Sequence, residues 1–193
     1  MKFPGIYAGA PSIIGLCGHM GAGKDAAAAL LSMLWYERIS FADELKSEVA
    51  AAISDPSKIP SELPEYISSL ILSCNREEVY AKPTSERMRV ILQFWGTDFR
   101  RAQDPDYWVK LVSHRIQPGR KYVISDVRFA NEAAMIREKG GVVWKIDRPV
   151  AINGIPGHAS EQAIDSIEPD VVIYNHGTLL DMAQKLRGLV VAQ

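Results

Sequence analysis

A glycine-rich segment near the N-terminus limits the fold of this chain more than any other feature. The apolar run 12–17 is typical of a buried strand, and the alanine-rich run 24–36 is typical of a helix. Between them stands "GHMGAGKD", Gly18 to Asp25. Glycines let several backbone N–H groups converge on phosphate oxygens, and the start of the following helix favours an anion. A strand, a glycine-rich turn and a helix in this order predict a phosphate-binding loop.

The loop departs from the usual pattern at one position. In G-x-x-x-x-G-K-[ST], the Lys is a point charge for the outer phosphates, and the Ser or Thr hydroxyl binds Mg²⁺. Lys24 fits this pattern, but Asp25 stands where the hydroxyl is expected. A carboxylate also holds Mg²⁺, directly or through a water. Because Asp is equally favourable in the first turn of a helix, the residues alone leave both roles of Asp25 open.

The length and net charge of the chain limit the class of protein to which it can belong. The chain has 193 residues, of which 47% are hydrophobic and 23% charged, which suits one compact domain over 1–193. A net charge of −1 argues against a strongly basic nucleic-acid-binding protein. Cys17 and Cys74 have no metal-type spacing, and Cys17 is predicted to be a small core residue in a reducing compartment. With neither a signal-peptide pattern nor a membrane-length apolar run, we expect a cytoplasmic protein that acts on no membrane.

Strands and helices alternate along most of the chain. Further strands are predicted at 38–41, 121–129, 141–147 and 170–175, and further helices at 43–53, 65–72, 85–101, 104–116, 131–141 and 177–190. In the last helix, Thr178 and Asp181 are spaced like a capping box. The proline-rich segment 55–84 is expected to be an insert, and the segment after Arg148 a loop that leads into a helix. Five strands separated by helices predict an α/β fold with a parallel sheet covered on both faces.

Ligands of such sheets gather at the carboxyl ends of the strands, so the polar residues that follow the strands are the candidates for a site. Arg can bind a monophosphate with two hydrogen bonds, and an aromatic ring can stack on a base. The stretches "ISFADELK", "ILQFWGTDFRRAQDPDYWV", "ISDVRFANE" and "GHASE" contribute Phe41, Asp43, Lys46, Gln93, Trp95, Arg100, Arg101, Trp108, Asp126, Arg128, His158 and Glu161.

Several of these residues have a structural alternative. Trp95 and Phe99 lie on one helical face and are also explained as core residues. Arg100 and its neighbour Arg101 point in different directions on a helix, so at most one of them faces a cleft. Asp126 is also explained as a helix cap. His158 is also explained as an ordinary loop residue, and phosphoryl transfer depends on positioning and charge more than on a general base. Arg148, with Arg137 as a second candidate, is expected to close over a transferring phosphoryl group.

Taken together, "GHMGAGKD", "SFADELK", "LQFWGTDFRR…DPDYWV", "SDVRFANE", "GHASE" and "NHGTL" resemble the bacteriophage-type deoxynucleoside monophosphate kinases. The resemblance covers about 13–180 in order, and Asp after the loop Lys belongs to that family's pattern. It implies a P-loop kinase fold of three α/β/α layers with a five-stranded parallel sheet, a monophosphate-binding insert near 55–84 and a lid near 148–165. It also implies transfer of the γ-phosphate of ATP to a deoxynucleoside monophosphate with Mg²⁺, giving a diphosphate for DNA precursor synthesis.

The resemblance also implies roles for single residues. Lys24, Asp126 and Arg128 are the catalytic candidates, and Asp25 and Asp126 are the candidates for Mg²⁺. The ATP site is implied at Gly18, Gly21, Ala22, Gly23, Lys24, Asp25, Asn175 and Gly177, the last pair at the adenine. The acceptor site is implied at Phe41, Asp43, Lys46, Gln93, Trp95, Arg100, Trp108, Arg128 and Glu161. Arg148 and His158 are assigned to the lid.

Other readings remain open. The nearest is another small-molecule P-loop kinase, similar to dephospho-coenzyme A kinase or phosphomevalonate kinase. A second is a nucleotide-binding module without catalysis, which would bind ATP but transfer nothing. A GTPase is disfavoured because no N-K-x-D sequence follows the later strands. The accepted base and the oligomeric state are not determined by the sequence, and a homodimer is the one assembly considered.

Overall fold

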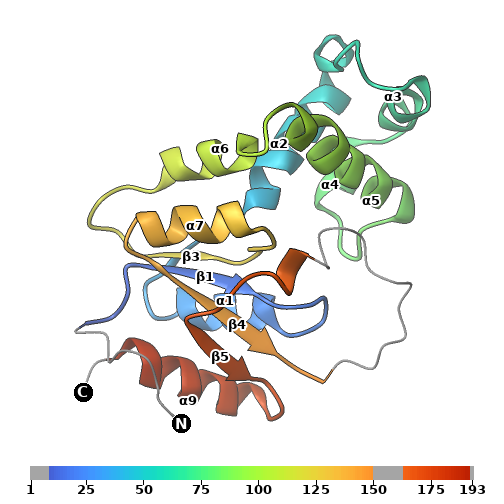
Figure 1. Cartoon of the computed structure of the whole chain (residues 1–193). Helices are drawn as coiled ribbons and strands as arrows, with labels where there is room; N and C mark the ends of the chain where they lie inside the picture. Colours follow the sequence, from blue (N-terminus) through green and yellow to red (C-terminus); the bar gives the residue numbers. More distant parts are fainter. Residues whose placement is uncertain (1–8, 150–162, 192–193) are drawn as a thin grey trace. The chain divides into compact units, whose positions relative to one another are not determined.

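The computed structural model describes residues 9–149 and 163–191, and these form two compact units. Unit 1 contains residues 9–40, 113–149 and 163–191, and unit 2 contains residues 41–112. Each unit is described by itself below (Figure 1). The predicted insert, 55–84, falls inside unit 2. A single domain over 1–193 with this insert stays a prediction.

Unit 1 is built on one parallel sheet. Its strands are β1(Ile13–Cys17), β2(Glu37–Ile39), β3(Tyr122–Ile124), β4(Val142–Asp147) and β5(Val171–Tyr174). Their order across the sheet is β2-β3-β1-β4-β5, and every neighbouring pair is parallel. The predicted α/β class with a five-stranded parallel sheet is therefore confirmed. Because β1 lies in the middle, the loop that follows it leaves the carboxyl end of the central strand.

Helices cover both faces of this sheet and make the predicted three layers. On one face, α1(Lys24–Ser32) and α9(Leu179–Val190) bury Leu31 and Leu186 against Leu16 and Trp144. On the other face lies α7(Ala130–Glu138), visible across the sheet from α9 in Figure 1. Alternate residues of β1 point to opposite faces, which is why all five can be buried. Burial raises the pKa of the Cys17 thiol, as expected for a small core residue.

Unit 2 is helical. It contains α2(Phe41–Ser54), a short 3₁₀ turn η1(Pro56–Lys58), α3(Glu65–Leu72), α4(Arg76–Tyr80), α5(Glu86–Gln93), the π-helix η2(Phe94–Arg101) and most of α6(Tyr107–Arg115). Polar side chains cap several of these elements. Asn75 and Glu78 form a capping box at α4, and the Ser85 hydroxyl accepts a hydrogen bond from the Met88 N–H at the start of α5.

Some boundaries differ from the predictions. The first helix ends at Ser32 rather than residue 36, and Trp35 beyond it has a positive φ of 69°. The helix expected after Asp104 begins only at Tyr107. The helix expected over 85–101 changes at Phe94 into a π-helix, whose hydrogen bonds span five residues instead of four. Apolar spacing of three and four residues does not separate these two helix types, so no sequence pattern predicted the change.

No helix within residues 9–149 and 163–191 is both long and apolar enough to cross a membrane.

The capping box predicted for the last helix is confirmed. The Thr178 N–H donates to Asp181 Oδ2 at 2.7 Å, and the Asp181 N–H donates to Thr178 Oγ1 at 3.2 Å.

Candidate phosphate-binding site and the acidic hub of unit 2

The loop between β1 and α1 is shaped by glycines in the left-handed region. Gly18, Gly21 and Gly23 have φ values of 137°, 81° and 102°. Side chains rarely adopt such values, so the path of this loop depends on glycine. Gly23 stands immediately ahead of α1, whose first N–H groups have no partner within the helix. The backbone therefore has the form required of an anion-binding turn at a helix start.

Two of these glycines also lie too close to neighbours for any side chain. A Cβ at Gly18 would lie 2.3 Å from the Ile146 carbonyl oxygen of β4, and a Cβ at Gly23 would lie 2.5 Å from Asn175 Nδ2. The loop is thus packed against the ends of β4 and β5. Its shape is set by tertiary contacts as well as by its own φ values.

Lys24 folds back over the loop. Its Nζ donates hydrogen bonds to the carbonyl oxygens of Gly18 and, at 2.9 Å, of His19. The ammonium group therefore lies above the loop backbone, where it adds positive charge to the turn. The contact of Lys24 with the outer phosphates, which the pattern predicts, stays a prediction.

Asp25 forms an ion pair with Arg38 of β2. Arg38 Nη2 donates to Asp25 Oδ1, and Arg38 Nε donates to Ser125 Oγ at 3.2 Å. The Asp25 side chain is 68% exposed and the Arg38 side chain 39% exposed. The acidic residue in the hydroxyl position thus has a cation beside it, which offsets its charge near the loop. Sequence reasoning missed Arg38 because no local pattern joins a β2 residue to the start of α1.

The residues after β5 contact the loop and the last helix. Asn175 Nδ2 donates to the Ala22 carbonyl at 2.8 Å, and the Asn175 N–H donates to the Asp147 carbonyl at 2.6 Å. Asn175 therefore braces the phosphate loop from the adjacent part of the sheet. Gly177 lies against the capping box, where a Cβ would be 2.4 Å from Asp181 Oδ2. Their predicted contact with adenine stays a prediction.

A buried carboxylate shapes the turn after β3. Asp126 and Arg128, both half-buried, follow this strand. Glu132, only 2% exposed, accepts hydrogen bonds at Oε2 from the N–H groups of Arg128 at 2.7 Å and Phe129 at 3.1 Å. Glu132 thereby fixes the backbone that carries Arg128. The sequence "SDVRFANE" contains Glu132, but its spacing alone does not show that the carboxylate turns back onto this backbone.

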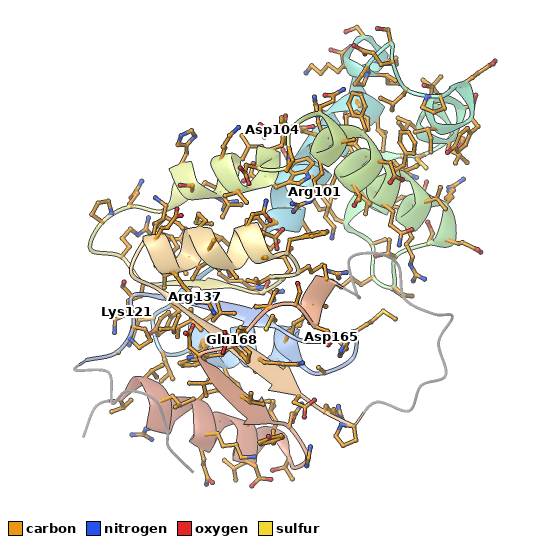
Figure 2. All side chains as sticks on the ribbon, viewed as in Figure 1. Arg101, Asp104, Lys121, Arg137, Asp165 and Glu168 are labelled. Atoms are coloured by element: carbon orange, nitrogen blue, oxygen red, sulfur yellow. The ribbon has the colours of Figure 1, made fainter. Side chains whose placement is uncertain are left out.

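Further charged groups of unit 1 pair with residues of the loop, of β4 and of the segment ahead of β5. Asp165 Oδ1 lies 3.1 Å from His19 Nε2 in the loop and 3.7 Å from Lys145 Nζ of β4. Arg137 of α7 donates to the Glu168 carbonyl, ahead of the amino end of β5 (Figure 2). The predicted closure of Arg137 over a transferring phosphoryl group stays a prediction.

In unit 2, a single carboxylate gathers three donors. Glu48 of α2 accepts at Oε2 from Trp95 Nε1 and from Arg100 Nε, both at 2.9 Å. Its Oε1 accepts from the Tyr107 hydroxyl. Burial, followed by the hydrogen bond to Glu48, raises the pKa of Tyr107 to about 12, so the phenol remains a donor at neutral pH. We call Glu48, Trp95, Arg100 and Tyr107 the acidic hub.

The aromatic residues predicted for the acceptor site lie inside unit 2. Trp95 is 1% exposed and Trp108 3% exposed. Trp108 Nε1 donates to the Gly96 carbonyl at 2.9 Å, while the Trp95 indole N–H is bound in the acidic hub. Both rings are therefore buried and their indole N–H groups are satisfied within unit 2. Their role at a nucleoside stays a prediction.

The remaining predicted residues are placed as follows. In unit 2, Phe41 is buried at the start of α2, Asp43 is exposed on the same helix, Lys46 is half-buried there, and Gln93 is half-buried at the end of α5. In unit 1, Arg148 is exposed directly after β4. His158, Glu161 and most of the predicted lid lie outside the described residues.

Comparison with known proteins gives a matching family model, a relative and two similar solved structures. A family model described as "Deoxynucleotide monophosphate kinase" matches residues 64–186. A relative from Acanthamoeba polyphaga mimivirus, named "Putative deoxynucleotide monophosphate kinase", is 33% identical over 193 residues, covering 86% of this chain and 90% of the relative. Among solved structures, a dephospho-CoA kinase from Campylobacter jejuni matches with a TM-score of 0.48 and 16% identity over 93% of this chain and 95% of its own. TT1252 from Thermus thermophilus matches with a TM-score of 0.43 and 18% identity over 93% of this chain and 96% of its own.

Proposed function

The chain belongs to the deoxynucleotide monophosphate kinase family, and from this premise we propose how its residues divide the work of phosphoryl transfer. The protein is a phosphotransferase that acts on deoxynucleoside monophosphates. We take ATP as the donor. Such transfer relies on positioning and charge stabilisation, so each proposed role below is one of binding, orienting or neutralising charge.

The donor phosphates bind the loop from Gly18 to Asp25. The geometry of this loop is the observation that carries the proposal. Left-handed glycines expose backbone N–H groups ahead of α1, and the Lys24 ammonium lies on the loop carbonyls, from which it can turn to phosphate oxygens. Asn175 holds the loop backbone through Ala22. Arg128, on a backbone fixed by Glu132, supplies positive charge after the neighbouring strand β3.

The residues of unit 1 fit a magnesium ion that arrives with the nucleotide. Mg²⁺ is usually bound by one or two carboxylates together with substrate phosphates, rather than by a cage of protein ligands. Residues 9–149 and 163–191 hold no group of three or more His, Cys, Asp or Glu side chains that could form such a cage. Asp25 and Asp126, at the loop and after β3, are the carboxylates that would hold the ion, directly or through water. When bound, the ion would neutralise phosphate charge.

The acceptor monophosphate binds residues of unit 2. Arg100 is the proposed ligand of its phosphate, and Lys46 of α2 adds a second cation. Phe41, Asp43, Gln93, Trp95 and Trp108 remain proposed residues of the nucleoside side, together with the insert 55–84. Arg128 is proposed to meet the phosphoryl group in transfer. The lid at 148–165, with Arg148, His158 and Glu161, is proposed to exclude water from the reaction.

Several wider expectations also belong to this proposal. A cytoplasmic place of action, within the host for a phage-encoded chain, is one of these proposals. Bacteriophage origin follows from the resemblance alone. The homodimer is likewise a proposal, to be examined by the mass of the protein in solution.

An acceptor panel tests the function directly. The protein is incubated with ATP, Mg²⁺ and each deoxynucleoside monophosphate in turn, including thymidylate, deoxyguanylate and modified pyrimidine monophosphates, and diphosphate formation is followed. We expect product from at least one of them. Two further arms contain dephospho-coenzyme A and phosphomevalonate. Product only in those arms would favour the rival kinases, and ATP binding without any product would favour a module that does not catalyse.

The variant Lys24→Ala tests the loop. We expect kcat to fall by about a hundredfold or more, the scale on which removal of one charge-stabilising donor acts, while the far-ultraviolet circular dichroism stays that of the wild type. Lys139→Ala, which removes an exposed cation at the end of α7, is the control and should keep most of the activity. Full activity of Lys24→Ala would show that the loop does not hold the donor.

A further inference from the structure

In the acidic hub of unit 2, more hydrogen bonds converge on one carboxylate than a single ion pair would provide. Glu48 uses both carboxylate oxygens, and its three donors come from the π-helix η2 and from α6. The side chains of Glu48 and Arg100 are only 23% and 25% exposed. A partly buried carboxylate with three donors is held in a single orientation, because each of its oxygens is fixed by at least one hydrogen bond.

The π-helix is what brings two of the donors together. Trp95 and Arg100 are five residues apart, and both donate to Oε2 of Glu48 at 2.9 Å. On an α-helix, residues three and four apart are neighbours, whereas residues five apart point in different directions. The hydrogen bonds of a π-helix span five residues, which places this pair on a common face. Such widened turns are frequently found at functional sites.

The guanidinium of Arg100 is hydrogen-bonded at one edge and lies against two aromatic rings. Its Nε is bound to Glu48, and its Cζ lies 5.1 Å from the ring centre of Phe99 and 4.8 Å from that of Tyr107. Among the described residues, no hydrogen bond is made by its two terminal amino groups. These two groups form one end of the planar guanidinium and match two oxygens of a phosphate. The contacts therefore fix the plane of Arg100 while leaving its phosphate-binding end available.

We propose that Glu48 is a positioning residue for the acceptor, which holds Arg100 by Nε so that its two terminal amino groups meet the phosphate of the deoxynucleoside monophosphate end-on. Trp95 and Tyr107 orient Glu48 in turn. The inference rests on the proposed function, since it takes Arg100 as the acceptor-phosphate ligand. It adds a residue that no motif identifies, and it gives the buried Trp95 a role that does not require contact with the base.

Three substitutions of Glu48 separate its position from its charge. Glu48→Asp keeps the charge but shortens the side chain by one methylene, so it cannot reach all three donors. Glu48→Gln loses the charge but keeps an oxygen for Arg100 and Trp95, while its amide can donate to the Tyr107 hydroxyl. Glu48→Ala removes every acceptor, and Glu48→Asp carries the test if that variant does not fold. Glu86→Gln, an exposed change on α5, is the control.

The readout is the KM of the best acceptor from the panel, measured beside the KM of ATP. Arg100→Ala should raise the acceptor KM about ten- to a hundredfold, because hydrogen bonds to charged groups contribute about 1.5–3 kcal/mol and 1.4 kcal/mol is tenfold. Glu48→Asp and Glu48→Ala should raise it about five- to tenfold, and Glu48→Gln less than about threefold. The KM of ATP should change less than about twofold in all of them and in Glu86→Gln.

A double variant distinguishes positioning from general destabilisation. In the Arg100→Ala background, Glu48→Asp should not raise the acceptor KM further, because Glu48 acts only through Arg100. An unchanged acceptor KM in folded Glu48→Asp, an equal rise in both KM values, or an additive double variant would each overturn the inference. If Arg100→Ala itself leaves the acceptor KM unchanged, the proposed role of Arg100 fails first, whatever Glu48 does.

Discussion

The side-chain amide of Asn175 donates a 2.8 Å hydrogen bond to the carbonyl of Ala22, a residue 153 positions earlier in the chain. This contact joins the end of β5 to the phosphate loop. It makes the shape of the loop depend on a strand that the loop does not adjoin in sequence. The bond is part of a close approach, because Gly23 lies directly beside the same amide group.

Removing this amide should loosen the loop. Asn175→Ala should lower the free energy of unfolding by about 1 kcal/mol, the usual contribution of one hydrogen bond, and should raise the dissociation constant of ATP. Asn175→Asp should weaken ATP binding more, since a carboxylate would face the Ala22 carbonyl. Both are measured by calorimetric titration and chemical denaturation. His176→Ala, at the exposed next residue, is the control, and loss of ATP affinity only in this control would contradict the prediction.

The ion pair of Arg38 with Asp25 predicts a coupled effect on nucleotide binding in the absence of metal. In EDTA, Arg38→Ala should weaken ATP binding up to about fivefold, the limit for an exposed pair, because the Asp25 charge then repels the phosphates. Asp25→Ser should strengthen it. In the Asp25→Ser background, Arg38→Ala should have a smaller effect. Equal effects of Arg38→Ala in both backgrounds would indicate that Arg38 contacts the nucleotide itself.

Glu132 should matter for both stability and catalysis. Glu132→Ala leaves the N–H groups of Arg128 and Phe129 without their acceptor, so unfolding should become easier by about 1–3 kcal/mol. Because the backbone of Arg128 is then released, kcat should fall while ATP binding persists. Glu132→Gln keeps one acceptor oxygen and should lose less of both. Glu138→Ala, exposed on the same helix, provides the reference, and a kcat equal to that reference would remove the link to Arg128.

The capping box of α9 predicts an acid-dependent contribution to stability. Hydrogen bonds from the Thr178 N–H and hydroxyl hold the pKa of Asp181 below its ordinary value. A depressed folded-state pKa stabilises the protein above the unfolded-state pKa, and this contribution is lost as the pH falls through the folded-state value. The difference in unfolding free energy between wild type and Asp181→Asn should therefore be present at pH 7 and fade in acid. A difference independent of pH would rule out this origin.

The features that the sequence predicted correctly are those whose signals lie within a few neighbouring residues. The glycine turn before Lys24 and the capping box at Thr178 carry their signals within a few neighbouring residues, so the sequence was sufficient to identify them, although Ile146 and Asn175 also shape the turn. The five strands followed from apolar runs between helices, although β3 is shorter than its run.

Residues joined by the tertiary fold were not predictable in this way. Arg38 and Glu48 lie in ordinary-looking segments, and their roles arise only when another element brings Asp25 or Arg100 beside them. The burial of Trp95 could not be separated from stacking on a ligand, because both require the same large aromatic side chain. The change to a π-helix at Phe94 was hidden for a related reason, since its apolar residues also fit an α-helix.

The middle position of β1 has a consequence for how the protein fluctuates. Along both sides this strand is hydrogen-bonded, to β3 and to β4, whereas β2 and β5 each have one such neighbour within residues 9–149 and 163–191. Transient fraying should start at the outer strands, and amide protons of Ile14 and Leu16 should be among the slowest to exchange for deuterium. The loop proposed to bind the donor phosphates thus follows the strand expected to be the most protected, so its first residues should stay in place while the outer strands fray.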